Sequence, residues 1–232
     1  MTPRIALVFG GSRGIGAACV EALAADGYQV AHTFVKQGTA GRGAYAADIR
    51  DAASVRGVFD AVERDFGAPP DVVIANAGIN VPAGPMAQFD PDNFRQLVEV
   101  NIVGAFNILA EAARRVMDGG AIVGITTSLV RHAVPGTGPY TASKAAVESL
   151  LRSMAKELSG RRIRVNGVAP GPVDTELFNA GKTEEAKQRM AAFSPLNRIG
   201  RPAEIAEVVR FLASDKASWI QGQIVQPNGG MV

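Results

Sequence analysis

The chain has 232 residues, of which 47% are hydrophobic and 20% are charged, so length and composition indicate one packed globular domain rather than a disordered protein. Its 24 basic and 22 acidic residues are interspersed and leave a net charge of +2, which argues against a nucleic-acid binder with a basic stripe. One cysteine excludes an internal disulfide, two histidines are too few for a metal cluster, and no apolar run approaches the roughly 18 residues of a membrane span.

Short apolar runs rich in valine and isoleucine alternate along the chain with longer amphipathic stretches. The apolar runs predict strands at residues 5–9, 28–34, 44–48, 71–75, 121–126, 163–168 and 223–226. The amphipathic stretches predict helices at residues 14–26, 51–66, 91–117, 138–159 and 202–214. Most of the runs are apolar throughout, as in strands of a parallel sheet that is covered on both faces. We therefore predict an α/β fold in which residues 1–232 form a single domain, with a doubly wound, Rossmann-type parallel sheet of about seven strands.

The first predicted strand follows the N-terminus directly and ends in a glycine-rich loop. The opening residues MTPRIALVFG contain no targeting segment, so we expect a cytoplasmic protein without a membrane partner. Gly10, Gly14 and Gly16 have the spacing GxxxGxG between this strand and the next helix. Glycines at such positions permit a tight turn and let backbone N–H groups approach a pyrophosphate, while the helix N-terminus adds partial positive charge. The loop therefore predicts a dinucleotide site.

A short connection, VKQGTAGRGA, separates the second predicted strand from the third. A parallel crossover normally needs a dozen or more residues, so either this shortened crossover is an irregular loop or the sequence lacks a segment. The region HTFVKQ also lacks the carboxylate that grips the ribose 2′-hydroxyl in NAD sites. Arg13 and Lys36 flank the place where a 2′-phosphate would lie, and Arg42 is a further candidate if the connection displaces Lys36. We therefore expect NADP(H) to be preferred over NAD(H).

The stretch GPYTASKAAV places Tyr140 and Lys144 four residues apart in a predicted helix. Residues i and i+4 lie on one helix face, so the phenol and the ammonium can converge on one point. Taken alone, the pair also fits a half-exposed tyrosine beside a solvated lysine.

With the glycine loop and the Tyr–Lys pair in one chain, the sequence resembles the short-chain dehydrogenase/reductase family along nearly its whole length. GGSRGIG resembles the cofactor loop of the family, ADI (47–49) its adenine-contacting turn, and ANAG (75–78) its NNAG motif with Ala75 in place of the first asparagine. VNIVG (100–104) carries Asn101 at the helix-four asparagine, YTASK is the YxxxK motif, and APGPVDT (169–175) resembles the segment that closes over the nicotinamide. Residues 171–187 and the C-terminal QIVQPNGGMV look closest to the 3-oxoacyl-carrier-protein reductase and hydroxynaphthalene-reductase-like branch.

The resemblance implies a set of cofactor contacts at matching positions. The implied cofactor-binding residues are Gly10, Ser12, Arg13, Gly14, Ile15, Gly16, Lys36, Asp48, Ile49, Asn76, Ala77, Gly78, Tyr140, Lys144, Pro170, Gly171, Val173 and Thr175. Asp48 is expected to hydrogen-bond the adenine.

The resemblance also implies the catalytic roles. Tyr140 would be the general acid that protonates the carbonyl oxygen, and the cation of Lys144 would lower the phenol pKa and hold the nicotinamide ribose. The hydroxyl that binds the substrate oxygen is expected 13 residues before the tyrosine, which is Thr127, although Ser128 lies 12 residues before it. Asn101 would hold a water that links Lys144 to solvent, or would only hydrogen-bond a kinked helix backbone.

Residues 174–200 resemble the substrate lid of the family, with Phe178, Met190 and Phe193 either covering the substrate or packing as ordinary helix residues. The sequence therefore predicts an NADPH-dependent reductase that transfers hydride reversibly to a ketone or 3-oxoacyl carbonyl, with no metal. A hydroxynaphthalene- or quinone-type reductase and a non-catalytic NADP(H)-binding regulator are the alternatives. We expect a small-molecule carbonyl or alcohol as substrate, no nucleic-acid partner, and a homotetramer or homodimer, since the apolar surface of residues 93–117 exceeds what one sheet face needs.

Overall fold

The computed structural model describes residues 4–35 and 41–232. In this part of the chain a seven-stranded sheet has the order β3-β2-β1-β4-β5-β6-β7, and all of its neighbouring strands are parallel. The strands are β1 (Ile5–Phe9), β2 (Gln29–Phe34), β3 (Ala44–Ala46), β4 (Val72–Ala75), β5 (Ala121–Ile125), β6 (Arg164–Val168) and β7 (Ile224–Val225). The predicted doubly wound Rossmann-type sheet is confirmed, and each predicted strand is present within two residues at either end.

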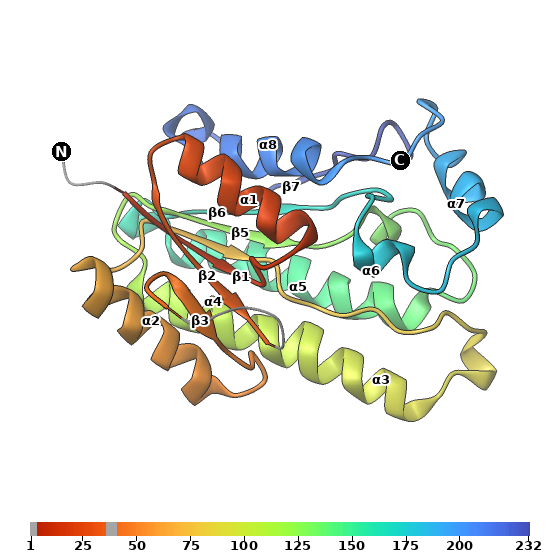
Figure 1. The fold of residues 1–232 in the computed structure, drawn as a ribbon, viewed down its shortest axis with the longest axis horizontal. Coiled ribbons are helices and arrows are strands. Elements are labelled where there is room, and N and C mark those ends of the chain that lie inside the picture. Colours follow the sequence, from red (N-terminus) through yellow and green to blue (C-terminus); the bar gives the residue numbers. More distant parts are fainter. Residues whose placement is uncertain (1–3, 36–40) are drawn as a thin grey trace.

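The helices that cover the sheet lie on two sides of it (Figure 1). The helices are α1 (Gly14–Ala25), α2 (Ala52–Phe66), α3 (Pro91–Leu97), the π-helix η2 (Val98–Gly104), α4 (Ala105–Arg115), α5 (Gly138–Glu157), α6 (Glu176–Asn179), α7 (Glu184–Ala191) and α8 (Pro202–Ala213). Short 3₁₀ turns are η1 (Met86–Gln88), η3 (Ser128–Val130), η4 (Ser159–Arg161) and η5 (Asp215–Ala217). Figure 1 shows α1 and α8 on one face, α2, α4 and α5 on the other, and α6 and α7 near one end of the sheet.

The alternation of side chains along each strand builds two cores. Leu7 and Phe9 of β1 belong to the cluster that packs against α2, α4 and α5, whereas Ala6 and Val8 belong to the cluster that packs against α1 and α8. All four side chains are fully buried. A strand covered on both faces buries side chains at every position and is therefore mostly apolar, which explains why runs such as β1 do not alternate with polar residues.

The functional edge of the sheet lies where the chain changes direction. β1 is flanked by β2 on one side and by β4 on the other, so the loops after β1 and β4 diverge from adjacent carboxyl ends. In open α/β sheets, ligands bind in the crevice at such a switch point. The glycine loop after β1 and the ANAG segment after β4 both lie there.

The predicted shortened crossover between the second and third strands is present. β2 ends at Phe34 and β3 begins at Ala44, and β3 pairs only with residues 32–34 of β2. From the end of β2 to the start of β3, the chain therefore has to go back along β2 by only about two residues, roughly 7 Å, and not by the whole length of a strand. A short β3 at the edge of the sheet removes the need for a long helical crossover.

The long helix predicted at residues 91–117 is interrupted by the π-helix η2, a feature that the sequence analysis did not predict. Asn101 lies inside this wide turn, and its side chain bonds both the backbone N–H and the backbone C=O of Ile79, at 2.8 and 2.9 Å. π-helical turns are rare and occur frequently at functional sites. Here the wide turn lies where a side chain of the helix is bonded to the loop after β4.

Candidate active site

The glycine loop leaves the N-terminus of α1 open to a ligand. Gly10 and Gly14 have positive φ angles of 75° and 55°, which few other residues adopt. A Cβ atom on Gly16 would lie 2.0 Å from the carbonyl oxygen of Gly10, so only glycine permits this approach. α1 has no side-chain cap and no acidic residue in its first turn, whereas the N-termini of α2 and α3 are capped by aspartates. Uncapped N–H groups at a helix N-terminus form an anion site, which suits a pyrophosphate.

Asn76 connects the glycine loop to the end of β4. Its Nδ2 donates hydrogen bonds to the carbonyl oxygens of Gly10, at 2.9 Å, and of Phe9, at 3.3 Å. The bonds hold the turns that follow β1 and β4 together, so the two loops form one wall of the crevice.

Tyr140 and Lys144 both line a cavity of about 680 Å³. They lie one turn apart on α5, which has Pro139 in its first turn. The ammonium of Lys144 donates a hydrogen bond to the carbonyl oxygen of Ile125, 3.1 Å away at the end of β5. Burial lowers the pKa of Lys144 to about 8. Burial raises the pKa of Tyr140 to about 12, against the opposing effect of a hydrogen bond with the Thr127 hydroxyl, so the lowering of the phenol pKa by Lys144 that the resemblance implied is not found in this structure. The phenol of Tyr140 and the ammonium of Lys144 thus line the same cavity, whose surface is largely apolar.

The two adjacent hydroxyls after β5 have different surroundings. Thr127 lines the cavity and makes the hydrogen bond with Tyr140. Ser128 is not among the lining residues; it is 1% exposed, donates to the carbonyl oxygen of Ala169 at 2.7 Å, and accepts from Nδ2 of Asn228 at 2.9 Å. The hydroxyl of Ser128 is thus bonded to the protein on both its donor and acceptor sides.

Asn101 is buried and fixes the loop that follows β4. Besides its two bonds to Ile79, its Nδ2 donates to Oγ of Ser143 at 3.1 Å. A Cβ atom on Gly78 would lie 3.1 Å from Oδ1 of Asn101 and 3.2 Å from Nζ of Lys144, so the three residues meet closely. Its bonds go to the loop after β4 and to α5, rather than to the backbone of its own helix.

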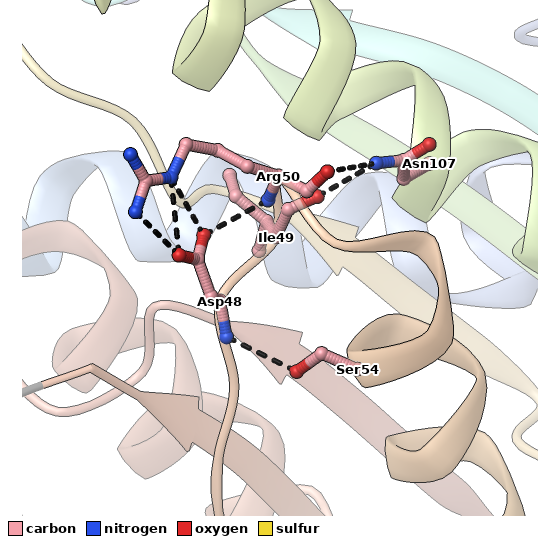
Figure 2. Close-up of polar contacts among 5 residues, drawn as sticks. All are labelled: Asp48, Ile49, Arg50, Ser54 and Asn107. Atoms are coloured by element: carbon pink, nitrogen blue, oxygen red, sulfur yellow. Dashed lines mark hydrogen bonds and ion pairs between the residues drawn. The ribbon is translucent and has the colours of Figure 1, made fainter.

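Asp48, the expected adenine partner, is bonded to Arg50 by both carboxylate oxygens (Figure 2). The shortest of these contacts is 2.6 Å, and the hydrogen bonds from Arg50 lower the pKa of Asp48. Figure 2 also shows Ser54 at the backbone N–H of Asp48 and Asn107 at the carbonyl oxygens of Ile49 and Arg50. The turn after β3 is therefore held by α2 and α4 together, with its carboxylate already paired.

Of the cations considered for the 2′-phosphate, Arg13 and Arg42 are among the described residues, and they lie in different places. Arg13 forms an ion pair of 3.1 Å with Glu176 at the start of α6, and both side chains are exposed. Lys36 lies outside the described residues. The guanidinium of Arg42 lies 5.5 Å from the centre of the Phe66 ring, at the C-terminal end of α2. Since α2 starts beyond the carboxyl end of β3 and runs back toward the start of β4, Arg42 lies away from the crevice and is not a phosphate candidate.

Residues 174–200 contain two short helices, α6 and α7, which the sequence analysis did not predict as helices. Their N-termini are capped by Thr175 and Thr183, whose hydroxyls accept from backbone N–H groups at 3.1 and 3.3 Å. Phe178, Met190 and Phe193 all line the cavity and are only partly buried. All three side chains therefore lie at the cavity, where a substrate lid would place them.

The structure brings about half of the predicted site residues to the cavity surface. Those that line the cavity are Ile15, Asn76, Gly78, Thr127, Tyr140, Lys144, Pro170, Gly171, Val173 and Thr175. Those that do not line it are Gly10, Ser12, Arg13, Gly14, Gly16, Asp48, Ile49, Ala77, Asn101 and Ser128. The sequence analysis missed further lining residues, among them Asn80, Val81, Phe89, Val134, Lys182 and Met231. Position after the carboxyl end of a parallel strand was the signal that could have identified Asn80 and Val81.

Within residues 4–35 and 41–232, every helix is too short or too polar to span a bilayer. In the same residues, no three His, Cys, Asp or Glu side chains are grouped so that they could hold a metal ion.

Known proteins resemble this chain along almost its whole length. A family model described as enoyl-(acyl carrier protein) reductase matches residues 10–232. The chain is 39% identical over 254 residues to a chloroplastic NADPH-dependent aldehyde reductase-like protein of Arabidopsis thaliana, which covers 99% of this chain and 94% of the relative. It is 38% identical over 232 residues to the 3-oxoacyl-(acyl-carrier-protein) reductase MabA of Mycobacterium tuberculosis, covering 98% of this chain and 92% of the relative. A solved short-chain dehydrogenase/reductase from Serratia marcescens matches with a TM-score of 0.89 at 35% identity, over 98% of this chain and 97% of that one.

Proposed function

Because this chain belongs to the short-chain dehydrogenase/reductase family, we propose that it is an NADPH-dependent reductase of ketone, aldehyde or 3-oxoacyl carbonyl groups. One observation supports the proposal: a phenol, an ammonium and a hydroxyl, from Tyr140, Lys144 and Thr127, all line the same cavity. The reaction is reversible, so the enzyme also oxidises the corresponding alcohols.

The residues of the chain divide the proton chemistry between them. NADPH, when bound, supplies the hydride. Tyr140 is the general acid, and its raised pKa keeps the phenol protonated at neutral pH until negative charge develops on the carbonyl oxygen. Lys144 is mainly protonated at neutral pH and stabilises the phenolate that remains after proton transfer. Thr127 donates a hydrogen bond to the same carbonyl oxygen. Ser128 is less suited to this role, because its hydroxyl is already hydrogen-bonded to Ala169 and Asn228.

The residues at the switch point fit a dinucleotide. The uncapped start of α1 and the glycine loop receive the pyrophosphate, and Asn76 keeps the loop in place. Val173 and Thr175 line the cavity from the segment after β6, opposite the glycine loop: the Cγ2 of Thr175 is 3.2 Å from the position of a Cβ on Gly14. Asn101 acts by holding the loop after β4 beside Lys144, and the predicted water relay remains part of the proposal.

The preference for NADPH rests on charge. β2 ends in Phe34 and is followed by Val35, so no carboxylate in the described part of this edge repels a 2′-phosphate. Arg13 is the cation of the glycine loop. Its ion pair with Glu176 is exposed and therefore weak, so Arg13 can leave Glu176 and bind a phosphate. The names of the aldehyde reductase relatives point to the same cofactor.

The test is NADPH oxidation measured against a panel of aldehydes, an acetoacetyl thioester, diketones and quinones. We expect turnover of at least one aldehyde, ketone or thioester, and its loss in Tyr140→Phe. Turnover of quinones alone would favour the hydroxynaphthalene- or quinone-type alternative. Tight NADPH binding with no turnover of any compound would favour the non-catalytic regulator.

Assembly and location belong to the same proposal. Phe106 on α4 is 53% exposed, and Phe94 on α3 and Met117 just after α4 are also exposed. Such apolar surface is typical of an interface, so we propose a homotetramer or homodimer. We propose a cytoplasmic location, which cell fractionation tests directly.

A further inference from the structure

One lid side chain gives the cavity a charge that the proposed chemistry does not use. Lys182 lies between α6 and α7 and lines the cavity. Among the described residues that line it, Lys144 and Lys182 are the two with charged side chains, and none is an aspartate or glutamate. Lys144 is buried and bonded to the carbonyl oxygen of Ile125 at the end of β5. The lid side of the cavity therefore carries one cation and no compensating carboxylate.

Lys182 is held by neutral groups alone. Its ammonium donates to the carbonyl oxygen of Phe178 and lies 4.9 Å from the centre of the Phe178 ring. No carboxylate of the described residues lies within 4.0 Å of it. An ammonium has three N–H donors, so two remain after the bond to Phe178. The carbonyl and the ring orient the ammonium and leave it able to bind an anion.

A second lysine of the same lid shows the contrast. Lys187, on α7, forms an ion pair of 2.7 Å with Glu184, and it is not among the residues that line the cavity. Burial lowers the pKa of Lys182, which is the cost of placing a cation in a largely apolar space without an anion. An anionic group of a ligand would remove that cost and would take up the two remaining donors.

We propose that Lys182 is a specificity-determining residue that binds an anionic group, such as a carboxylate, on the carbonyl substrate. This inference rests on the proposed reductase function and adds the substrate class: carbonyl compounds with an apolar body and a negative charge remote from the reacting carbon. Phe178, Met190 and Phe193 contact the apolar body, while Tyr140 and Thr127 bind the carbonyl oxygen at the other end. A phosphate of the cofactor is the competing source of negative charge, and the experiment has to separate the two.

The experiment compares 4-formylbenzoate with its neutral methyl ester, at saturating NADPH. Lys182→Met should raise KM for 4-formylbenzoate about tenfold or more with a smaller change in kcat, and should change kcat/KM for the ester less than threefold. Lys182→Arg should restore most of the loss, because a guanidinium also binds carboxylates. Lys187→Met removes the same charge from the same lid and should leave both substrates nearly unaffected.

Three results would overturn the inference. Equal losses for the two aldehydes would mean that Lys182 only supports the lid, and the same loss in Lys187→Met would mean a general effect of lid charge. A higher KM for NADPH with an unchanged ratio between the aldehydes would assign Lys182 to a cofactor phosphate. Calorimetric titration of 4-formylbenzoate into the NADP⁺-loaded protein and its Lys182→Met variant decides the matter without turnover, with a tenfold weaker Kd expected in the variant. Absence of reduction of either aldehyde would count against the proposed function alone.

Discussion

Replacing the adjacent hydroxyls of Thr127 and Ser128 one at a time separates catalysis from stability. Thr127→Val keeps the shape of the side chain and removes the hydroxyl that lines the cavity beside Tyr140. Loss of one hydrogen-bond donor to a developing oxyanion costs about 2–4 kcal/mol, so we expect kcat/KM to fall about 30- to 900-fold. Its folding should change little, since the Thr127 hydroxyl has only a 3.3 Å contact with the backbone N–H of Leu129 besides its bond with Tyr140.

Ser128→Ala should show the opposite result. It removes the 2.7 Å bond to Ala169 and leaves the buried amide of Asn228 without its partner. An unsatisfied buried donor costs about 1–3 kcal/mol, which corresponds to a decrease in Tm of roughly 2–10 °C for a domain of this size. Steady-state kinetics and thermal unfolding of both variants are the measurements. The assignment is refuted if Ser128→Ala loses the activity and Thr127→Val keeps it, and the whole account of substrate-oxygen binding fails if neither variant loses tenfold in kcat/KM.

Four further predictions test the remaining parts of the site and the assembly. Tyr140→Phe should bind NADPH with nearly unchanged Kd and lose most of kcat, and a comparable kcat would remove Tyr140 from the acid role. The unmodified protein should prefer NADPH over NADH by more than tenfold in kcat/KM, and Arg13→Ala should reduce that ratio about tenfold or more; equal use of both cofactors would contradict it. Burial lowers the pKa of Lys144 from 10.5 to about 8, so the buried charge destabilises the folded state fully below pH 8 and progressively less between pH 8 and pH 10.5. Lys144→Met removes this charge and should therefore raise Tm more at pH 7 than at pH 10. An equal increase in Tm at both pH values would contradict the prediction. Light scattering at micromolar concentration should give an oligomer for the unmodified protein and a smaller species for Phe106→Asp, and a monomeric unmodified protein would exclude the proposed assembly.

The fold was predictable because its signals are local. The apolar runs predicted as strands at residues 5–9 and 71–75 match β1 and β4 within one residue, since a strand buried on both faces consists mostly of apolar side chains. The glycine loop was predictable for a similar reason: the φ of Gly10 and the 2.0 Å approach at Gly16 exclude other residues there. The sequence alone left the shortened crossover as an anomaly, and its explanation is that β3 pairs only with the last residues of β2.

The π-helix η2 was not predictable from residues 91–117, whose pattern is that of one continuous helix. Its cause is a contact between segments: Asn101 bonds the backbone of Ile79, which is 22 positions away in the sequence. The lid helices were missed for a different reason. α6 is a single turn and α7 is mostly polar, so neither gives a strong apolar period, although Thr175 and Thr183 were readable as caps.

The choice between Thr127 and Ser128 shows what a motif leaves undetermined. Both residues follow β5, and both carry a hydroxyl at nearly the expected spacing from Tyr140, so the sequence kept both as candidates. The difference between them arises from Asn228, which lies 100 positions after Ser128 and follows β7, the strand that is separated from β5 only by β6. A hydroxyl that already accepts from a buried amide and donates to a buried carbonyl would have to break those bonds to serve a substrate. The packing of distant segments therefore leaves Thr127, and not Ser128, as the hydroxyl at the cavity. Partners also distinguish the two lysines: Lys187 is paired with Glu184 of its own helix, whereas no carboxylate of the described residues pairs with Lys182.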